Sequence, residues 1–102
     1  MAITKFSNKD PSETILVTYD FSNLLSLPDE ILIGSNWNII TTTGIDSTPN
    51  NILSGIYALD RTSAAAYITG GINGNTYDII VIVTTNKNQI LKMSGSMNIK
   101  VQ

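Results

Sequence analysis

The chain has 102 residues, the length of one small domain, and a net charge of −2. The sequence contains no Cys, which excludes disulfides, thiolate nucleophiles and Cys-based metal sites, and no His, which excludes imidazole catalysis and His-ligated metals. Ile, Thr, Asn and Ser make up nearly half of the residues. This mixture of β-branched residues and turn formers indicates an all-β fold.

Several classes of function are disfavoured by the same composition. With carboxylates, Lys, Tyr and one Arg as the remaining reactive groups, we expect neither an enzyme, nor a cofactor, nor a bound metal. The acidic balance without a basic stripe argues against direct nucleic-acid binding. No apolar run reaches the roughly 18 residues that a membrane span needs, and residues 1–10 do not resemble a signal peptide.

The first two thirds of the chain alternate apolar and polar residues between turn signals. Residues 1–12 are polar and include Asp10-Pro11, which predicts an N-terminal arm before a single domain over residues 13–102. The residues around 46–51 have the composition of a loop. Four strands are predicted, over residues 15–21, 31–43 (bent or divided around Gly34), 52–59 and 64–69.

The strongest turn signal follows the fourth of these strands. Gly70, Gly71 and Gly74 stand with two Asn in six residues, and we expect a positive φ at one or more of these glycines. A phosphate-binding loop is disfavoured, because no helix pattern and no Walker Lys-Ser/Thr follow. The turn leads into a predicted strand over 76–85, and after a turn at 86–88 into a last strand. The apolar face of that last strand comprises Leu91, Met93, Met97, Ile99 and Val101.

No helical stripe competes with these strands, and at most one helical turn is expected within residues 23–29. About seven short strands separated by turns predict a single small immunoglobulin-like β-sandwich. Such sandwiches have a core aromatic residue, and Trp37 is predicted to fill that place.

Two groups of residues are candidates for binding sites. Asp29 and Glu30 could form a calcium or acid–base pair, but no calcium-loop pattern surrounds them, and solvated loop carboxylates are the favoured interpretation. Trp37 with Tyr57, Tyr67 and Tyr77 could form a sugar-stacking platform. A core position for Trp37 is favoured over that platform.

The strand at 76–85 is unusual because both of its faces are apolar. Tyr77, Ile79, Val81 and Val83 share one face, whereas Ile80 and Ile82 share the other with Asp78. A sandwich strand has one core face, so Ile80 and Ile82 are predicted to lie on the outside. An outer apolar patch suggests either contact with a partner protein or a neighbouring copy, or cover by the N-terminal arm. Partner contact is the favoured interpretation, with the arm ordered only after docking.

The order of the motifs resembles a known family, the small immunoglobulin-like virion proteins of tailed bacteriophages called fibre–tail adaptor or head–tail connector proteins. The resemblance covers about residues 9–101. Its most specific part is Gly70-Gly71-x-x-Gly74-x-x-Tyr77 followed by Thr84-Thr85. The other matching segments are Lys9-Asp10-Pro11-x-Glu13, Tyr19-Asp20-Phe21-Ser22-x-x-Leu25, Asp29-x-Ile31-x-x-Ser35-x-Trp37, Thr62-Ser63-Ala64 and Ile68-Thr69.

This resemblance implies a structural subunit of the virion, made in the host cytoplasm and present in several copies near the neck of the particle. Its partners would be portal, connector, tail or fibre subunits, and it would have no active site. The sequence departs from the family at Ile80 and Ile82, where the strand usually alternates, and at the turn 86–88, which lacks Gly. A capsid decoration protein and a carbohydrate-binding module stay open as alternatives.

Overall fold

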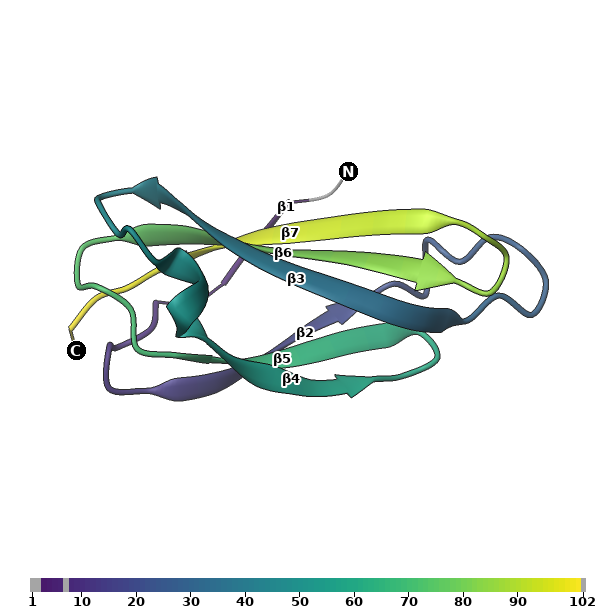
Figure 1. Ribbon diagram of the computed structural model, residues 1–102, viewed down its shortest axis with the longest axis horizontal. Helices are drawn as coiled ribbons and strands as arrows, with labels where there is room; N and C mark the ends of the chain where they lie inside the picture. The colour runs from purple at the N-terminus through teal and green to yellow at the C-terminus, as the bar shows by residue number, and fades with distance from the viewer. Residues whose placement is uncertain (1–2, 7, 102) are drawn as a thin grey trace.

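A computed structural model describes residues 3–6 and 8–101 as an all-β fold of two facing sheets (Figure 1); the side chains of residues 3–5, 57 and 58 lie outside this description. The four-stranded sheet has the order β1-β7-β6-β3, and the three-stranded sheet has the order β2-β5-β4. Only β1 and β7 pair in parallel among the described neighbours. The strands are β1 (Ile3–Lys5), β2 (Thr14–Asp20), β3 (Leu32–Thr43), β4 (Leu53–Leu59), β5 (Ser63–Thr69), β6 (Thr76–Thr85) and β7 (Ile90–Asn98).

The predicted all-β sandwich is therefore confirmed, and its strand bounds lie close to the expected ones. The orders β2-β5-β4 and β7-β6-β3 correspond to strands B-E-D and G-F-C of an immunoglobulin domain. These orders favour the immunoglobulin type, which stays a prediction. The segment predicted as a bent or divided strand forms the single strand β3, with register shifts near Leu32 and near Thr43. The region expected as a loop contains a short 3-10 helix, η1 (Pro49–Ile52), which begins at a proline.

The core lies between the two sheets, and period-2 alternation creates it. Every second residue of β6 from Tyr77 to Val83 is fully buried, as the pattern predicts. Trp37 is 8% exposed and packs beside Tyr19, with ring centroids 5.8 Å apart, so its predicted core position is confirmed. The expected core face of the last strand is correct except at Val101, which is 60% exposed. The remaining large core side chains are Val17, Phe21, Leu32, Ile39, Ile52, Ile68, Met97 and Ile99.

The glycine-rich segment forms the turn between the two sheets. Gly70, Gly71 and Gly74 have φ values of 67°, 102° and 90°, which confirms the expected positive φ at all three. At the turn 86–88, where a Gly was expected, Asn88 has a φ of 65°. Asn tolerates the left-handed region better than most residues, so the turn closes without Gly.

The described residues of the N-terminal arm lie along β7. β1 continues the sheet beside residues 94–96 of β7, and the backbone of Phe6 donates to Ser96. Lys9 is 1% exposed, and its ammonium donates to the carbonyl oxygens of Asp10 and Gly70. Burial lowers the pKa of Lys9. The expectation that the arm is ordered only after docking is wrong for these residues, because they pair with the single chain.

Candidate functional site

The candidate site is the outer face of the four-stranded sheet, where β6 presents Ile80 and Ile82. Ile82 is 38% exposed and Ile80 is half-buried, whereas their neighbours Ile79 and Val81 are fully buried. The prediction that these two isoleucines face away from the core is confirmed. Contact of these two residues with a partner stays a prediction.

A third isoleucine, Ile40 of β3, belongs to the same face and was missed from the sequence. Ile40 is 41% exposed and pairs with Asp78, which lies two residues before Ile80 on β6. Residues diagonal to one another on neighbouring strands lie within reach of long side chains. The available signal was the alternation of β3, since Trp37 and Ile39 are core residues and Ile40 must point the other way. We call Ile40, Ile80 and Ile82 the outer-face patch.

Polar residues surround the outer-face patch, and two of them, Asp78 and Lys92, are charged. Across the strands, Ile80 lies between Asn38 and Ser94, Ile82 lies between Asn36 and Lys92, and Asp78 lies between Ile40 and Ser96.

The N-terminal arm does not cover this patch in the described residues. β1 occupies the edge of the sheet beyond β7, so β7 separates it from β6. The interpretation in which the arm folds over Ile80 and Ile82 is therefore wrong for residues 3–6 and 8–12. The patch stays open to a partner.

The suggested sugar-stacking platform is not present as such. Trp37 and Tyr77 are buried in the core, where no ligand could stack on them. Tyr67 is 37% exposed, but it lies on β5 of the other sheet. The side chain of Tyr57 falls outside the described residues. The platform interpretation is thus wrong for Trp37 and Tyr77.

Tyr77 instead organises the loops at one end of the sandwich. Its hydroxyl donates to Asp46 Oδ2 at 2.8 Å and accepts from the backbone N–H of Ile72 at 3.2 Å. The amide of Asn75 donates to Ile45 O and to the Tyr77 hydroxyl. The backbone N–H of Thr48 and then the Tyr77 hydroxyl lower the pKa of the Asp46 carboxyl. A tyrosine near the start of this strand that bonds back to the upstream backbone is also a feature of immunoglobulin domains.

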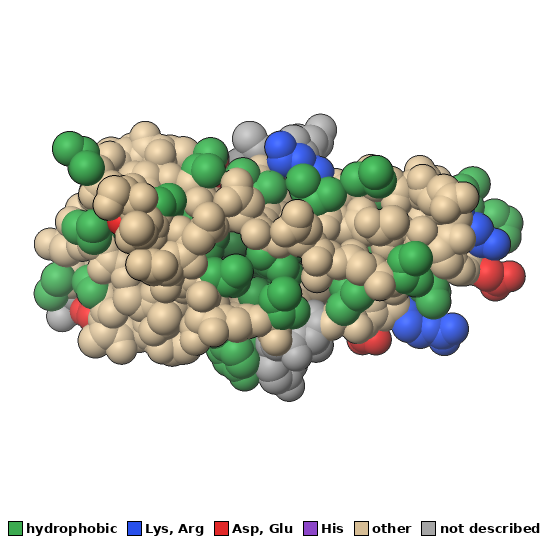
Figure 2. All heavy atoms as spheres, in the orientation of Figure 1, with side chains coloured by type: hydrophobic (Ala, Val, Ile, Leu, Met, Phe, Trp, Pro, Cys, Tyr) green, Lys and Arg blue, Asp and Glu red, His purple; other side chains and the backbone are tan. Residues whose placement is uncertain are grey.

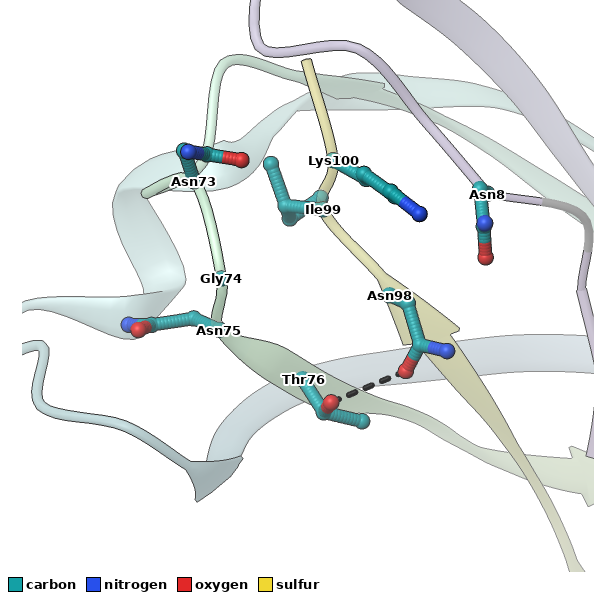
Figure 3. Close-up of a pocket in the computed structure, with 8 residues that line it drawn as sticks. All are labelled: Asn8, Asn73, Gly74, Asn75, Thr76, Asn98, Ile99 and Lys100. Atoms are coloured by element: carbon teal, nitrogen blue, oxygen red, sulfur yellow. Dashed lines mark hydrogen bonds between the residues drawn. The ribbon is translucent and has the colours of Figure 1, made fainter. Parts of the chain in front are cut away.

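Beside these loops lies a pocket of about 470 Å³ rich in asparagine (Figure 3). The Thr76 hydroxyl donates to Asn98 Oδ1 at 2.8 Å, and Asn73 Oδ1 accepts from the backbone N–H of Val101. These hydrogen bonds hold the turn and the end of β7 together. Its lining residues are Asn8, Asn73, Gly74, Asn75, Thr76, Asn98, Ile99 and Lys100.

Glu30 corrects the expectation of solvated carboxylates at 29–30. Asp29 is exposed, but Glu30 is only 6% exposed and accepts hydrogen bonds from Thr85 Oγ1 at 2.6 Å and from Gln89 Nε2. These bonds, that of Thr85 foremost, lower the pKa of Glu30. The carboxylate therefore joins the loop before β3 to the turn after β6. Leu27 N–H also donates to this carboxylate from three residues away, but Thr85 and Gln89 lie 55 and 59 residues away in the sequence, which is why sequence reasoning missed the burial of Glu30.

A group of charged residues lies at the opposite end of the molecule from Tyr77. Figure 2 shows Lys or Arg and Asp or Glu side chains together at the right end, and apolar side chains between β3 and β4 in the middle. The loops at this end carry Asp29, Asp60, Arg61 and Lys87. With principal extents of 45 × 23 × 22 Å, the molecule is a rod.

Nothing in the described part of the chain has the form of a metal centre. No three residues among Asp and Glu come together there as possible ligands. Within the same residues, no helix has the length and apolar character required to cross a membrane.

Comparison with known proteins identifies one family. The model of the podophage GP4 fibre-tail adaptor protein gp77 family matches residues 9–98 of the chain. No curated protein matches the sequence. The match covers both sheets from β2 to β7 and therefore includes the outer-face patch.

Proposed function

Because the chain belongs to the podophage fibre–tail adaptor family, we propose that it is a structural subunit that joins the head–tail connector region of the phage particle to tail components or fibres. The family match over residues 9–98 carries this proposal. An adaptor acts by binding other virion proteins, and the partners proposed here are portal, connector, tail or fibre subunits. The role involves no catalysis and no cofactor, and assembly takes place in the host cytoplasm.

The surface that we assign to this role is the outer-face patch. Ile40 and Ile82 are each about two-fifths exposed on a sheet face that the described residues of the chain do not cover. Leaving apolar surface in water is unfavourable, and its burial against a partner contributes about 25 cal/mol per Å². A particle neck with several copies of each subunit would offer the same contact repeatedly. We therefore propose that Ile80 and Ile82 contact another virion subunit or a neighbouring copy.

The experiment is incorporation of an Ile80→Lys, Ile82→Lys double variant into particles that lack the parental protein. Both side chains point away from the core, so we expect the variant to fold like the parent. Two charges on the contact face should abolish incorporation, measured by immunoblot of purified particles. The control is Leu16→Lys, which places one lysine, against two in the double variant, on an exposed residue of β2, on the outer face of the other sheet.

The outcomes separate the two parts of the proposal. Incorporation of the double variant at the parental level would show that this face is not the contact surface. Loss of incorporation in the Leu16→Lys control as well would mean that any added charge prevents assembly, and it would remove the support for this face. Absence of the parental protein itself from particles would overturn the adaptor role.

A further inference from the structure

The outer face of the four-stranded sheet carries two opposite charges as well as the outer-face patch. Lys92 of β7 is exposed and pairs across the strands with Ile82, and Asp78 of β6 is half-buried and pairs with Ile40. Neither charge forms an ion pair with another described side chain.

The spacing of these two charges is fixed by the sheet. They stand on neighbouring strands and four residues apart along the strand direction. With strands about 4.8 Å apart and a rise of about 3.3 Å per residue, their separation is roughly 14 Å. The midpoint between them falls between Ile80 and Ser94, which pair across the strands.

This placement gives the face the property that a two-fold symmetric contact requires, namely complementarity to itself. Consider a second copy that packs face to face on the first. A two-fold axis lies midway between the four-stranded sheets of the two copies and parallel to them, and it passes over this midpoint at a right angle to the line from Asp78 to Lys92. Rotation about this axis places Asp78 of each copy opposite Lys92 of the other. The same axis brings Ile80 opposite Ile80 of the second copy and Ile82 opposite Ile40 of the second copy. Apolar residues then meet apolar residues, and each charge meets its opposite.

The resulting geometry is one that sheets adopt. The strands of the two copies would run antiparallel and cross at about 40°, near the roughly 30° of aligned sheet packing.

We propose that a second copy of this chain packs face to face on the outer face of the four-stranded sheet, so that Asp78 of each copy pairs with Lys92 of the other around the outer-face patch. This inference rests on the proposed function for the choice of the face, and it names the neighbour that the face contacts. The two ends of each rod stay free for other subunits.

The test uses purified full-length protein and two single charge reversals, Asp78→Lys and Lys92→Asp. Sedimentation velocity over a range of concentrations should show a dimer for the parent. Each reversal places two like-charge pairs in the symmetric contact, which should raise the dissociation constant at least about a hundredfold. Lys5 of β1 pairs with Ser96, which in turn pairs with Asp78. Every variant therefore keeps Lys5, so that only the reversed charges differ from the parent.

The decisive arm mixes the two single variants in equal amounts. In the mixed pair each Lys meets an Asp, so we expect heterodimers, although neither variant forms a homodimer. The double reversal within one chain should dimerise like the parent. A parent that stays monomeric at about 100 μM, well above the dissociation constants of specific complexes, would overturn the proposal. Reversals that dimerise as the parent does, or a mixture that does not pair, would overturn it too.

A second measurement is independent of charge and of the folding of those variants. The chain has no Cys, so a Ser94→Cys variant carries a single thiol close to the two-fold axis. A short bismaleimide should link two copies of this variant, and a Thr18→Cys control on β2 of the other sheet should stay uncrosslinked. Equal crosslinking of the two variants would contradict the proposal. These assays contain no particles, so they test the dimer alone, whereas the incorporation experiment tests the adaptor role. Either proposal can therefore fail while the other is supported.

Discussion

Replacing Trp37 with Ala should reduce the free energy of unfolding by about 3–5 kcal/mol, as truncation of a large buried aromatic residue usually does. Trp37 is 8% exposed on β3 and packs on the ring of Tyr19 at a centroid distance of 5.8 Å. Removing its indole leaves a cavity between the two sheets that the surrounding core cannot fill. Urea denaturation monitored by circular dichroism measures the loss.

A Trp37→Phe variant is the matched control for this prediction. The indole N–H of Trp37 is buried and finds no hydrogen-bond partner among the described residues. Its removal therefore costs no hydrogen bond, and Phe keeps most of the aromatic volume. We expect the Phe variant to be clearly more stable than the Ala variant. An Ala variant with the unfolding midpoint of the parent would show that Trp37 is not a core residue.

Replacing Gly71 with Ala should cost about 2–4 kcal/mol, for two separate reasons. The φ of 102° lies in a region that residues with a Cβ rarely adopt. In addition, a Cβ at this position would lie 2.8 Å from Cγ1 of Ile99, a core side chain that is 1% exposed. The strain and the overlap add, because the backbone cannot relieve one without disturbing the turn. The shift in the urea midpoint measures the sum.

Gly70→Ala and Gly74→Ala separate the two contributions. Both glycines have a positive φ, but a Cβ at either would meet nothing within 4 Å. We expect each control to lose only the backbone cost, about 1–2 kcal/mol. If the Gly71 variant is no less stable than these controls, the contact with Ile99 does not constrain the turn.

The parts of the fold that follow from local alternation could be predicted from the sequence. Period-2 alternation fixed which residues of β6 lie in the core, and therefore the outward position of Ile80 and Ile82. The Gly70–Gly74 segment has the composition of a tight turn, and its glycines have the positive φ that such turns use. These features depend only on residues close together in the chain.

The remaining features depend on contacts between distant segments. The composition of residues 1–12 predicts that Lys9 belongs to a polar arm. Its buried ammonium instead donates a hydrogen bond to the carbonyl oxygen of Gly70, 61 residues away. Glu30 is buried because Thr85 and Gln89 satisfy its carboxylate. Ile40 was missed as part of the outer-face patch because the pairing of β3 with β6 puts it beside Asp78. A hydrophobic pattern gives the face of a residue, whereas its partners depend on the sheet order.

The most direct test of the adaptor role is the position of the protein in the purified phage particle. We expect electron microscopy of particles that carry a labelled copy to place the label at the neck, between the head–tail connector and the tail or fibres. The label should occur there in several copies, and particles without the protein should lack fibres or tail components. A label distributed over the head shell would contradict the adaptor role and assign the chain to capsid decoration.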